Sequence, residues 1–241
     1  MTMIVCMETS AASWLLDSQV PWQQLVNLGP AGFPAYARLR FLPDPRWPGQ
    51  KEAEAVARPD TPSEGDQLRA ALAVLSRHTS TPKQCYFCLW DGYGLHAPSH
   101  VVDGRQPSRQ QAEVEPLPRE AHSSVAPETA QPGLRPLSMQ PERPTHSAAT
   151  VRIPHRDYYL FQGAWSDLGD WGALQDPSGP HDWVPPPAFV WPADHAWCLA
   201  HDVDPHYAGI GANPVAIQAL LDDPRLDVVE ADPSREPPRY A

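Results

Sequence analysis

The 241-residue chain lacks the features that mark secreted and membrane proteins. It has only four cysteines, which are scattered and too few for a disulfide framework in a chain of this length. No apolar run approaches the roughly 20 residues of a membrane-spanning helix. The first residues, MTMIVCMETS, lack the basic start of a secretory signal. We therefore expect a cytoplasmic protein with reduced thiols and no membrane partner.

Basic residues are also scarce. The chain has 18 lysines and arginines against 29 aspartates and glutamates, which gives a net charge of -11. Only Lys51 and Lys83 are lysines. A surface that neutralises nucleic-acid phosphates needs the opposite sign, so nucleic acid is not an expected partner. An acidic surface fits a basic protein partner, because opposite charges steer association.

Aromatic residues are missing from one long segment, residues 103–150, which contains eight prolines and charges of both signs. Such a composition buries too little apolar surface to offset the entropy of an ordered chain. We predict a disordered, proline-rich insertion here. Residues 1–102 and 151–241 are then the two parts of a single domain.

The remaining segments alternate between strand and helix patterns. Strands are expected at YARLRFL, QCYFCLW, DYYLFQG, AFVWP, AWCLAHDV and DVVEAD, and helices near residues 18–28, 61–79 and 213–223. Because the helices do not alternate strictly with the strands, we predict an α+β fold. We expect a mainly antiparallel sheet of about five or six strands, together with two or three helices.

Capping residues mark where the predicted helices begin. Thr61 and Glu64 have the spacing of a capping box, and Asn213 precedes a proline at the first helical position. Asp17 or Ser18 is expected to cap the first helix, with Pro21 in its first turn.

The densest chemistry lies in residues 191–212, WPADHAWCLAHDVDPHYAGIGA. Cys198 and His201, together with Cys85 and Cys88, make a Cys3His set of the kind that binds zinc tetrahedrally. Against this, residues three apart in a strand point to opposite faces of the sheet. Zinc binding stays an alternative to buried free cysteines.

Two aspartates in this stretch suit another chemistry. On a strand, Asp202 and Asp204 share one face at a separation of about 7 Å, which fits paired carboxylates in a metal-dependent enzyme. The same DVDP sequence is typical of a strand that ends in a solvated turn. We expect an exposed rim around Asp202, Asp204, His206 and Tyr207 that binds a partner.

Gly209 and Gly211, with Glu230 and Asp232 some distance beyond, partly match a dinucleotide-binding fingerprint. The third glycine position is occupied by Pro214, which argues against that fold. We interpret the glycines as a tight segment before a capped helix.

Tryptophans also occur in a Gly-, Pro- and Asp-rich loop between DYYLFQG and AFVWP. Trp171 and Trp183 lie there with acidic residues between them. Aromatic side chains on a loop often anchor a partner, although they equally fold back over a sheet as a lid. We keep both interpretations.

Three segments, FPAYARLRFLPDP, CLWDGYG and WPADHAWCLAHDVDPHYAGIGA followed by AIQALLDDPRLDVV, resemble an uncharacterised family of bacterial cytoplasmic proteins. That family has no known activity, so the resemblance implies no catalytic residue. The order of a tryptophan-rich strand, Asp-x-Asp, a glycine-rich turn and a short helix is more loosely similar to bacterial toxin-immunity proteins.

The sequence favours a binding or interaction module over an enzyme, with no cofactor. Residues 194–241 contain nine acidic residues and three arginines, which fits a basic protein partner. Neutralising a toxin is one concrete version of this role. The alternative is a metal-dependent enzyme or zinc protein that uses Asp202 and Asp204, or Cys85, Cys88 and Cys198.

Overall fold

The computed structural model describes residues 3–56, 61–93, 149–169, 171, 185–203 and 205–241, which belong to one compact unit. The predicted insertion at 103–150 lies outside the described residues except at its end, where Thr150 begins a strand. Strands from both flanks of this segment pair in the same sheet.

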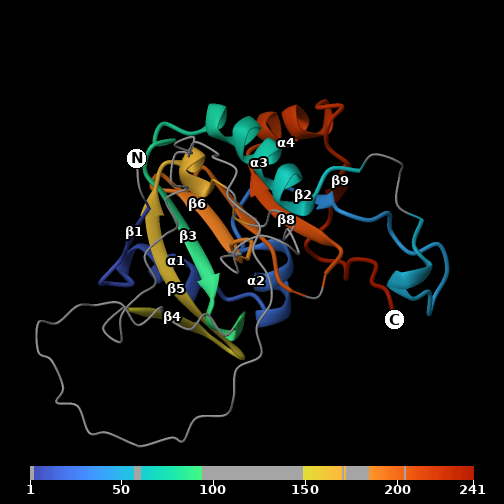
Figure 1. Cartoon of the computed structure of the whole chain (residues 1–241), viewed down its shortest axis with the longest axis horizontal. Coiled ribbons are helices and arrows are strands. Elements are labelled where there is room, and N and C mark those ends of the chain that lie inside the picture. Colours follow the sequence, from blue (N-terminus) through green and yellow to red (C-terminus); the bar gives the residue numbers. More distant parts are fainter. Residues whose placement is uncertain (1–2, 57–60, 94–148, 170, 172–184, 204) are drawn as a thin grey trace, which may run out of the picture. The chain divides into compact units, whose positions relative to one another are not determined.

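Nine strands within the described residues form one antiparallel sheet (Figure 1). Their order is β1-β5-β3-β6-β7-β8-β2-β9, and β4 also pairs with β5. The strands are β1 (Ile4–Val5), β2 (Ala35–Arg40), β3 (Cys85–Trp90), β4 (Thr150–Ile153), β5 (Arg156–Gly163), β6 (Phe189–Pro192), β7 (Trp197–Ala200), β8 (Tyr207–Ala212) and β9 (Val228–Ala231).

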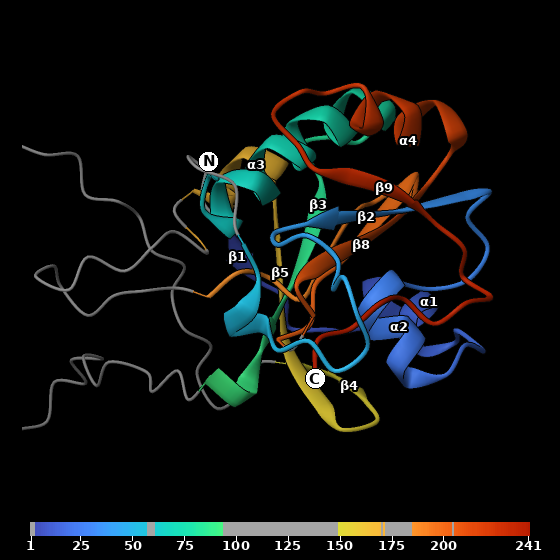
Figure 2. The same ribbon diagram turned by 90° about the vertical axis from the view of Figure 1, so that its right-hand side faces the viewer.

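Helices cover both faces of this sheet. In Figure 2, α3 (Glu64–Leu75) and α4 (Pro214–Leu221) lie on one side of it, and α1 (Ser13–Leu16) and α2 (Trp22–Leu28) on the other. None of the described helices has the length and apolarity needed to cross a bilayer. Short 3-10 helices occur at Ser10–Ala12, Glu52–Glu54, Ser76–His78, Asp91–Tyr93 and Trp165–Leu168.

The α+β class and the antiparallel sheet are confirmed, but the predicted strand number is too small. Three of the nine strands lacked a recognisable pattern. β1 has two residues and β4 begins inside the predicted insertion. β8 has the sequence YAGIGA, which was interpreted as a tight segment because glycine disfavours strands.

The core consists of two layers, one on each face of the sheet, as the alternation of side chains along a strand requires. On β3, Cys85, Phe87 and Leu89 belong to the layer under α3 and α4. Cys88 belongs to the layer that includes Leu25 of α2. The prediction that Cys85 and Cys88 point to opposite faces is confirmed.

Two glycines of β8 allow α2 and the segment after it to approach the sheet closely. A Cβ atom on Gly209 would lie 2.2 Å from the carbonyl oxygen of Asn27 and 2.5 Å from Cα of Leu28. On Gly211 it would lie 2.3 Å from the ring of Phe33. These glycines make room for packing within the fold, which accounts for them without a bound nucleotide.

The helix caps are partly as expected. The Asn213 side chain accepts a hydrogen bond from the Ala216 amide, which confirms the cap of α4. At α3, the cap is Ser63, which accepts from the Asp66 amide, and the prediction of Thr61 is wrong. The residue before a proline disfavours the helical conformation, so α3 begins after Pro62.

The helix predicted near residues 18–28 begins later than expected, and an additional short helix, α1, precedes it. α1 ends at Leu16, and α2 begins at Trp22 with Pro21 as its N-cap residue, so neither Asp17 nor Ser18 caps it.

The arginine side chains of β2 lie mostly inside the protein. Arg38 is only 7% exposed. β2 is an interior strand between β8 and β9, and the segment that follows it folds back over its end.

Candidate binding site

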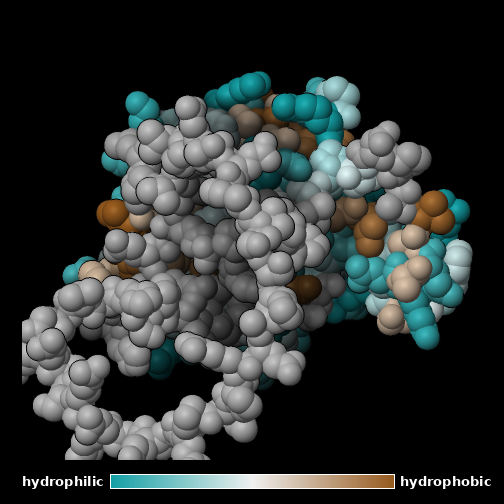
Figure 3. Space-filling model, in the orientation of Figure 1, coloured by the Kyte–Doolittle hydropathy of each residue, from teal (hydrophilic) through white to brown (hydrophobic). Residues whose placement is uncertain are grey.

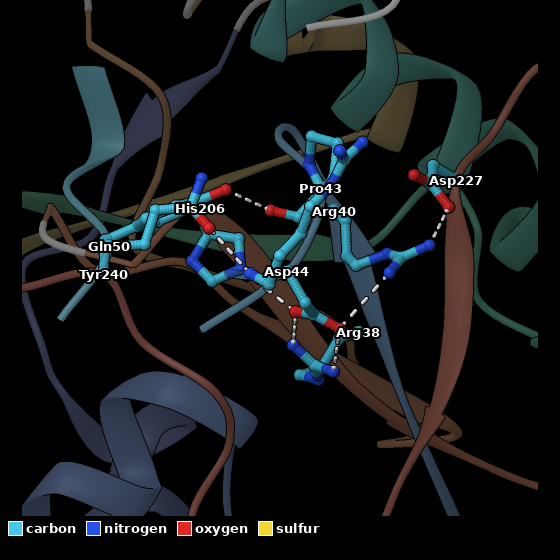
Figure 4. A network of polar contacts seen from close by, with 9 residues as sticks. Arg38, Arg40, Pro43, Asp44, Gln50, His206, Asp227 and Tyr240 are labelled. Carbon is cyan, nitrogen blue, oxygen red and sulfur yellow. Dashed lines mark hydrogen bonds and ion pairs between the residues drawn. The ribbon is translucent and has the colours of Figure 1, made fainter. Parts of the chain in front are cut away.

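The segment after β2 is a loop of residues 43–56, which we call the Trp47 loop. Asp44 at its start binds three side chains (Figure 4). Arg38 donates to both carboxylate oxygens, at 2.6 and 2.9 Å, in a bidentate pair. Arg40 donates to Asp44 at 3.2 Å, and Nε2 of His206 lies 3.1 Å from Oδ1. Bidentate pairing with a planar guanidinium fixes the orientation of the carboxylate, and hence the start of the loop.

The charges around Asp44 stabilise its ionised form. Partial burial by itself would raise the pKa of this carboxyl. Hydrogen bonds from Arg38 and His206, with the positive charges of Arg38 and Arg40, outweigh burial and lower the pKa to about 2. Burial lowers the pKa of His206, and the nearby Asp44 opposes this shift. A carboxylate oxygen only accepts hydrogen bonds, so Nε2–H of His206 is the donor to Asp44.

The rest of the Trp47 loop is held by Gln50, which is 4% exposed. Its side-chain oxygen accepts from the Arg46 amide at 2.7 Å, and its side-chain nitrogen donates to the Glu54 carbonyl at 3.4 Å. The Gln50 carbonyl accepts from the Ala241 amide at 2.9 Å. Tyr240 adds a hydrogen bond from its hydroxyl to the Pro43 carbonyl (Figure 4). Hydrogen bonds thus hold the loop both internally and against the chain near residue 240.

A loop held in this way displays apolar side chains to solvent. Trp47 is 51% exposed and Val56 is 71% exposed. Figure 3 shows hydrophobic side chains among hydrophilic ones on the lobe at the right, where this segment follows β2 in Figure 1. A half-exposed tryptophan on a fixed loop is the kind of side chain that anchors a protein partner.

Two of the predicted binding residues, His206 and Tyr207, lie beneath this surface. His206 and Tyr207 are buried, so the expectation of an exposed rim is wrong for them. Tyr207 begins β8, and the guanidinium of Arg38 lies 5.0 Å from the centre of its ring. The His206 carbonyl accepts a hydrogen bond from the Phe41 amide. Both residues position the Trp47 loop and present little surface of their own.

Asp202 is also buried, at 7% exposure, because it pairs with Arg156 of β5. Nε and Nη2 of Arg156 donate to the two Asp202 oxygens, each at 3.1 Å. The guanidinium lies 5.0 Å from the ring centre of Trp90 and 5.9 Å from that of Trp22. Asp204 lies outside the described residues. The structure therefore shows that the Asp202 carboxylate forms an ion pair with Arg156.

The residues of the proposed zinc site are not brought together. Cys85 lies on one face of the sheet, whereas Cys88 and Cys198 lie on the other. The His201 ring packs edge-on against Phe41, which belongs to the Cys85 layer, and burial lowers the pKa of His201 to about 4. Among the described residues, no three His, Cys, Asp or Glu side chains form a group that could hold a metal ion.

The two loop tryptophans have different outcomes. Trp171 is 4% exposed and packs edge-on against Phe87 and Phe161. The expectation of an exposed anchor is wrong for it, and the fold-back interpretation describes its position. Trp183 lies outside the described residues.

The sequence interpretation missed the residues that build the Trp47 loop: Arg38, Asp44, Trp47 and Gln50. The sequence analysis assigned residues 44–60 to neither a strand nor a helix. One signal was present. A tryptophan in a Pro- and Gly-rich segment without periodic apolar neighbours has no place in a strand or helix face.

No protein-family model matches this chain, and neither a curated protein nor a solved structure is detectably similar to it. The resemblances to a bacterial family and to immunity proteins therefore stay predictions.

Proposed function

We propose that this protein is a binding module that recognises another protein through the Trp47 loop. The observation that carries the proposal is that Trp47 is 51% exposed. Its loop is held by the hydrogen bonds of Asp44 and Gln50. Tryptophan is enriched among the few interface residues that supply most of the binding free energy. A partner that covers Trp47 would remove this surface from water.

The fixed backbone favours binding for an entropic reason. A mobile loop loses conformational freedom when a partner orders it, and this loss weakens the complex. In the Trp47 loop, the hydrogen bonds of Asp44 and Gln50 already restrict the chain. Less free energy is then lost when the partner binds.

The expected partner is a basic protein. The chain carries a net charge of -11, which attracts positive partners and raises their association rate. A toxin-neutralising role is one concrete form of this interaction. The pairing of Asp44 with Arg38 and of Asp202 with Arg156 supports binding over catalysis, since these carboxylates already hold structural partners.

The test compares capture by the wild-type chain with capture by Trp47→Ala, using lysate from the native cells and quantitative mass spectrometry. We expect one stoichiometric partner of positive net charge, with capture at least tenfold weaker for Trp47→Ala, as loss of a tryptophan hot spot implies. Val215→Ala is the matched control, because Val215 is an exposed apolar residue on α4.

Equal capture by wild type and by a folded Trp47→Ala variant would disprove the proposal, as would a partner of negative net charge. Circular dichroism and a urea unfolding curve establish that each variant is folded.

A further inference from the structure

A cavity of about 410 Å³ lies beside the Trp47 loop, between α2 and the chain near residue 240. Trp22 and Asn27 line it from α2, and Glu52 lines it from the loop. Asp202 and Tyr240 also contribute to its wall. Glu52 therefore belongs both to the Trp47 loop and to the cavity wall.

Asn27 is the first sign that the cavity accepts a ligand. It is only 6% exposed, yet its side-chain amide forms no hydrogen bond with any part of the chain that the structure describes. Its place in the cavity wall makes it available to a group that enters from outside.

The charge of the cavity indicates what that group is. Glu52 is exposed and has no ion pair among the described residues. Asp202 accepts one hydrogen bond from Arg156 at each oxygen, and a carboxylate accepts about four in total. One cation, Arg239, also lines the cavity, but its guanidinium lies 3.6 Å from the carboxylate of Glu236. Glu52 is thus the acidic side chain of the wall that has no ion pair among the described residues, and it favours a positive ligand.

The chain itself demonstrates which cation such surroundings accept. Arg156 places its guanidinium against Asp202 and near the ring of Trp22, two residues of this same wall. A guanidinium is planar, so it stacks on aromatic rings and donates several hydrogen bonds in fixed directions. An ammonium group stacks less well and is more strongly hydrated.

We propose that this cavity receives an arginine side chain of the basic partner, with Asn27 and Glu52 as its hydrogen-bond acceptors and Trp22 and Tyr240 as its aromatic walls. This inference rests on the proposed function and names what the partner inserts. Trp47 supplies apolar contact, and the cavity supplies the preference for arginine.

The test is an NMR titration of the full isotopically labelled chain with Nα-acetyl-arginine amide. We expect saturable shifts of the Asn27 side-chain amide and the Trp22 indole. The citrulline analogue has the same shape without the charge, and we expect it to bind at least tenfold more weakly. The lysine analogue should fall between the two.

Two variants locate the site. Asn27→Ala and Glu52→Gln should each weaken arginine binding at least threefold, whereas Val215→Ala should leave it unchanged. Glu52 is exposed, so its variant keeps the test valid even if Asn27→Ala fails to fold. Non-saturable shifts, equal binding of citrulline, or full affinity in Glu52→Gln would overturn the inference.

The two proposals fail separately. The titration uses no partner, so its failure leaves partner capture through Trp47 intact. Conversely, the arginine analogue could bind saturably while Trp47→Ala captures the partner as well as wild type does. That result would support the cavity as an arginine site and reject the Trp47 loop as the interface.

Discussion

Nε2 of His206 lies 3.1 Å from Oδ1 of Asp44, although 162 residues separate the two in the sequence. This contact joins the start of β8 to the start of the Trp47 loop. Arg38 reaches the same carboxylate from β2, so three separate segments meet at one charge. The position of the exposed Trp47 depends on this meeting.

Replacing Asp44 with asparagine should destabilise the protein and loosen the loop. Arg38 would be left buried without its carboxylate, and breaking a buried ion pair typically costs about 3 kcal/mol or more. Urea unfolding measures the loss, and hydrogen exchange at the Arg46 and Gln50 amides should become faster. Asp157→Asn is the control, because its pair with Arg152 is exposed and should contribute less than about 1 kcal/mol. Unchanged exchange in Asp44→Asn would show that the carboxylate does not hold the loop.

Gly209→Ala should be strongly destabilising. The new methyl group would meet the Asn27 carbonyl at 2.2 Å, and this backbone atom moves only if α2 shifts away from β8. Crowding of this kind in a packed core costs about 1–3 kcal/mol or more. Gly163→Ala is the matched control, since its nearest neighbour is the flexible Met3 side chain at 3.0 Å. Equal unfolding midpoints for the two variants would contradict the close approach of α2.

Stability should fall on mild acidification because of His201. Burial lowers its pKa from 6.5 to about 4, so the unfolded chain takes up a proton first as the pH drops below 6.5. The stability contributed by the neutral ring is complete above pH 6.5 and is lost progressively between pH 6.5 and pH 4. At pH 5 the free energy of unfolding should be lower than at pH 7 by about 2 kcal/mol from this residue.

The check is urea unfolding of wild type and His201→Gln at the two pH values. The variant should lose most of the difference, and the remainder belongs to His195 and His206, whose pKa values burial also lowers. If the free energy of unfolding of His201→Gln changes between the two pH values as much as that of wild type, another residue is responsible for the pH dependence.

The thiols should react in two classes. Cys6 is partly exposed, whereas the other three cysteines are buried. Burial raises the pKa of Cys85 to about 12, and that of Cys88 and Cys198 well above the usual value for a thiol. Since the thiolate is the reactive form, a colorimetric thiol reagent should label one cysteine quickly in the native protein and four in denaturant. Cys6→Ser should abolish the fast phase, and a second fast thiol would contradict the buried positions.

Local patterns in the sequence were enough to determine much of the secondary structure. The strand of residues 85–90, the helix begun by Asn213 and Pro214, and the opposite directions of Cys85 and Cys88 all follow from spacing within a few residues. Strand alternation and helix capping act over this short range, so the sequence alone predicts them.

The surroundings of each element depend on contacts between segments that lie far apart in the sequence. YAGIGA is a strand because β2 and β7 lie beside it and α2 packs on its glycines, which no local propensity indicates. Arg38 and His206 are buried because a loop and a distant strand meet at Asp44, whereas Trp47 on that same loop is 51% exposed. Burial is a property of contacts between distant segments, whereas periodicity is a property of neighbours along the chain. Spacing along the chain therefore predicts most of the elements, and contacts between distant segments determine which side chains a partner can reach.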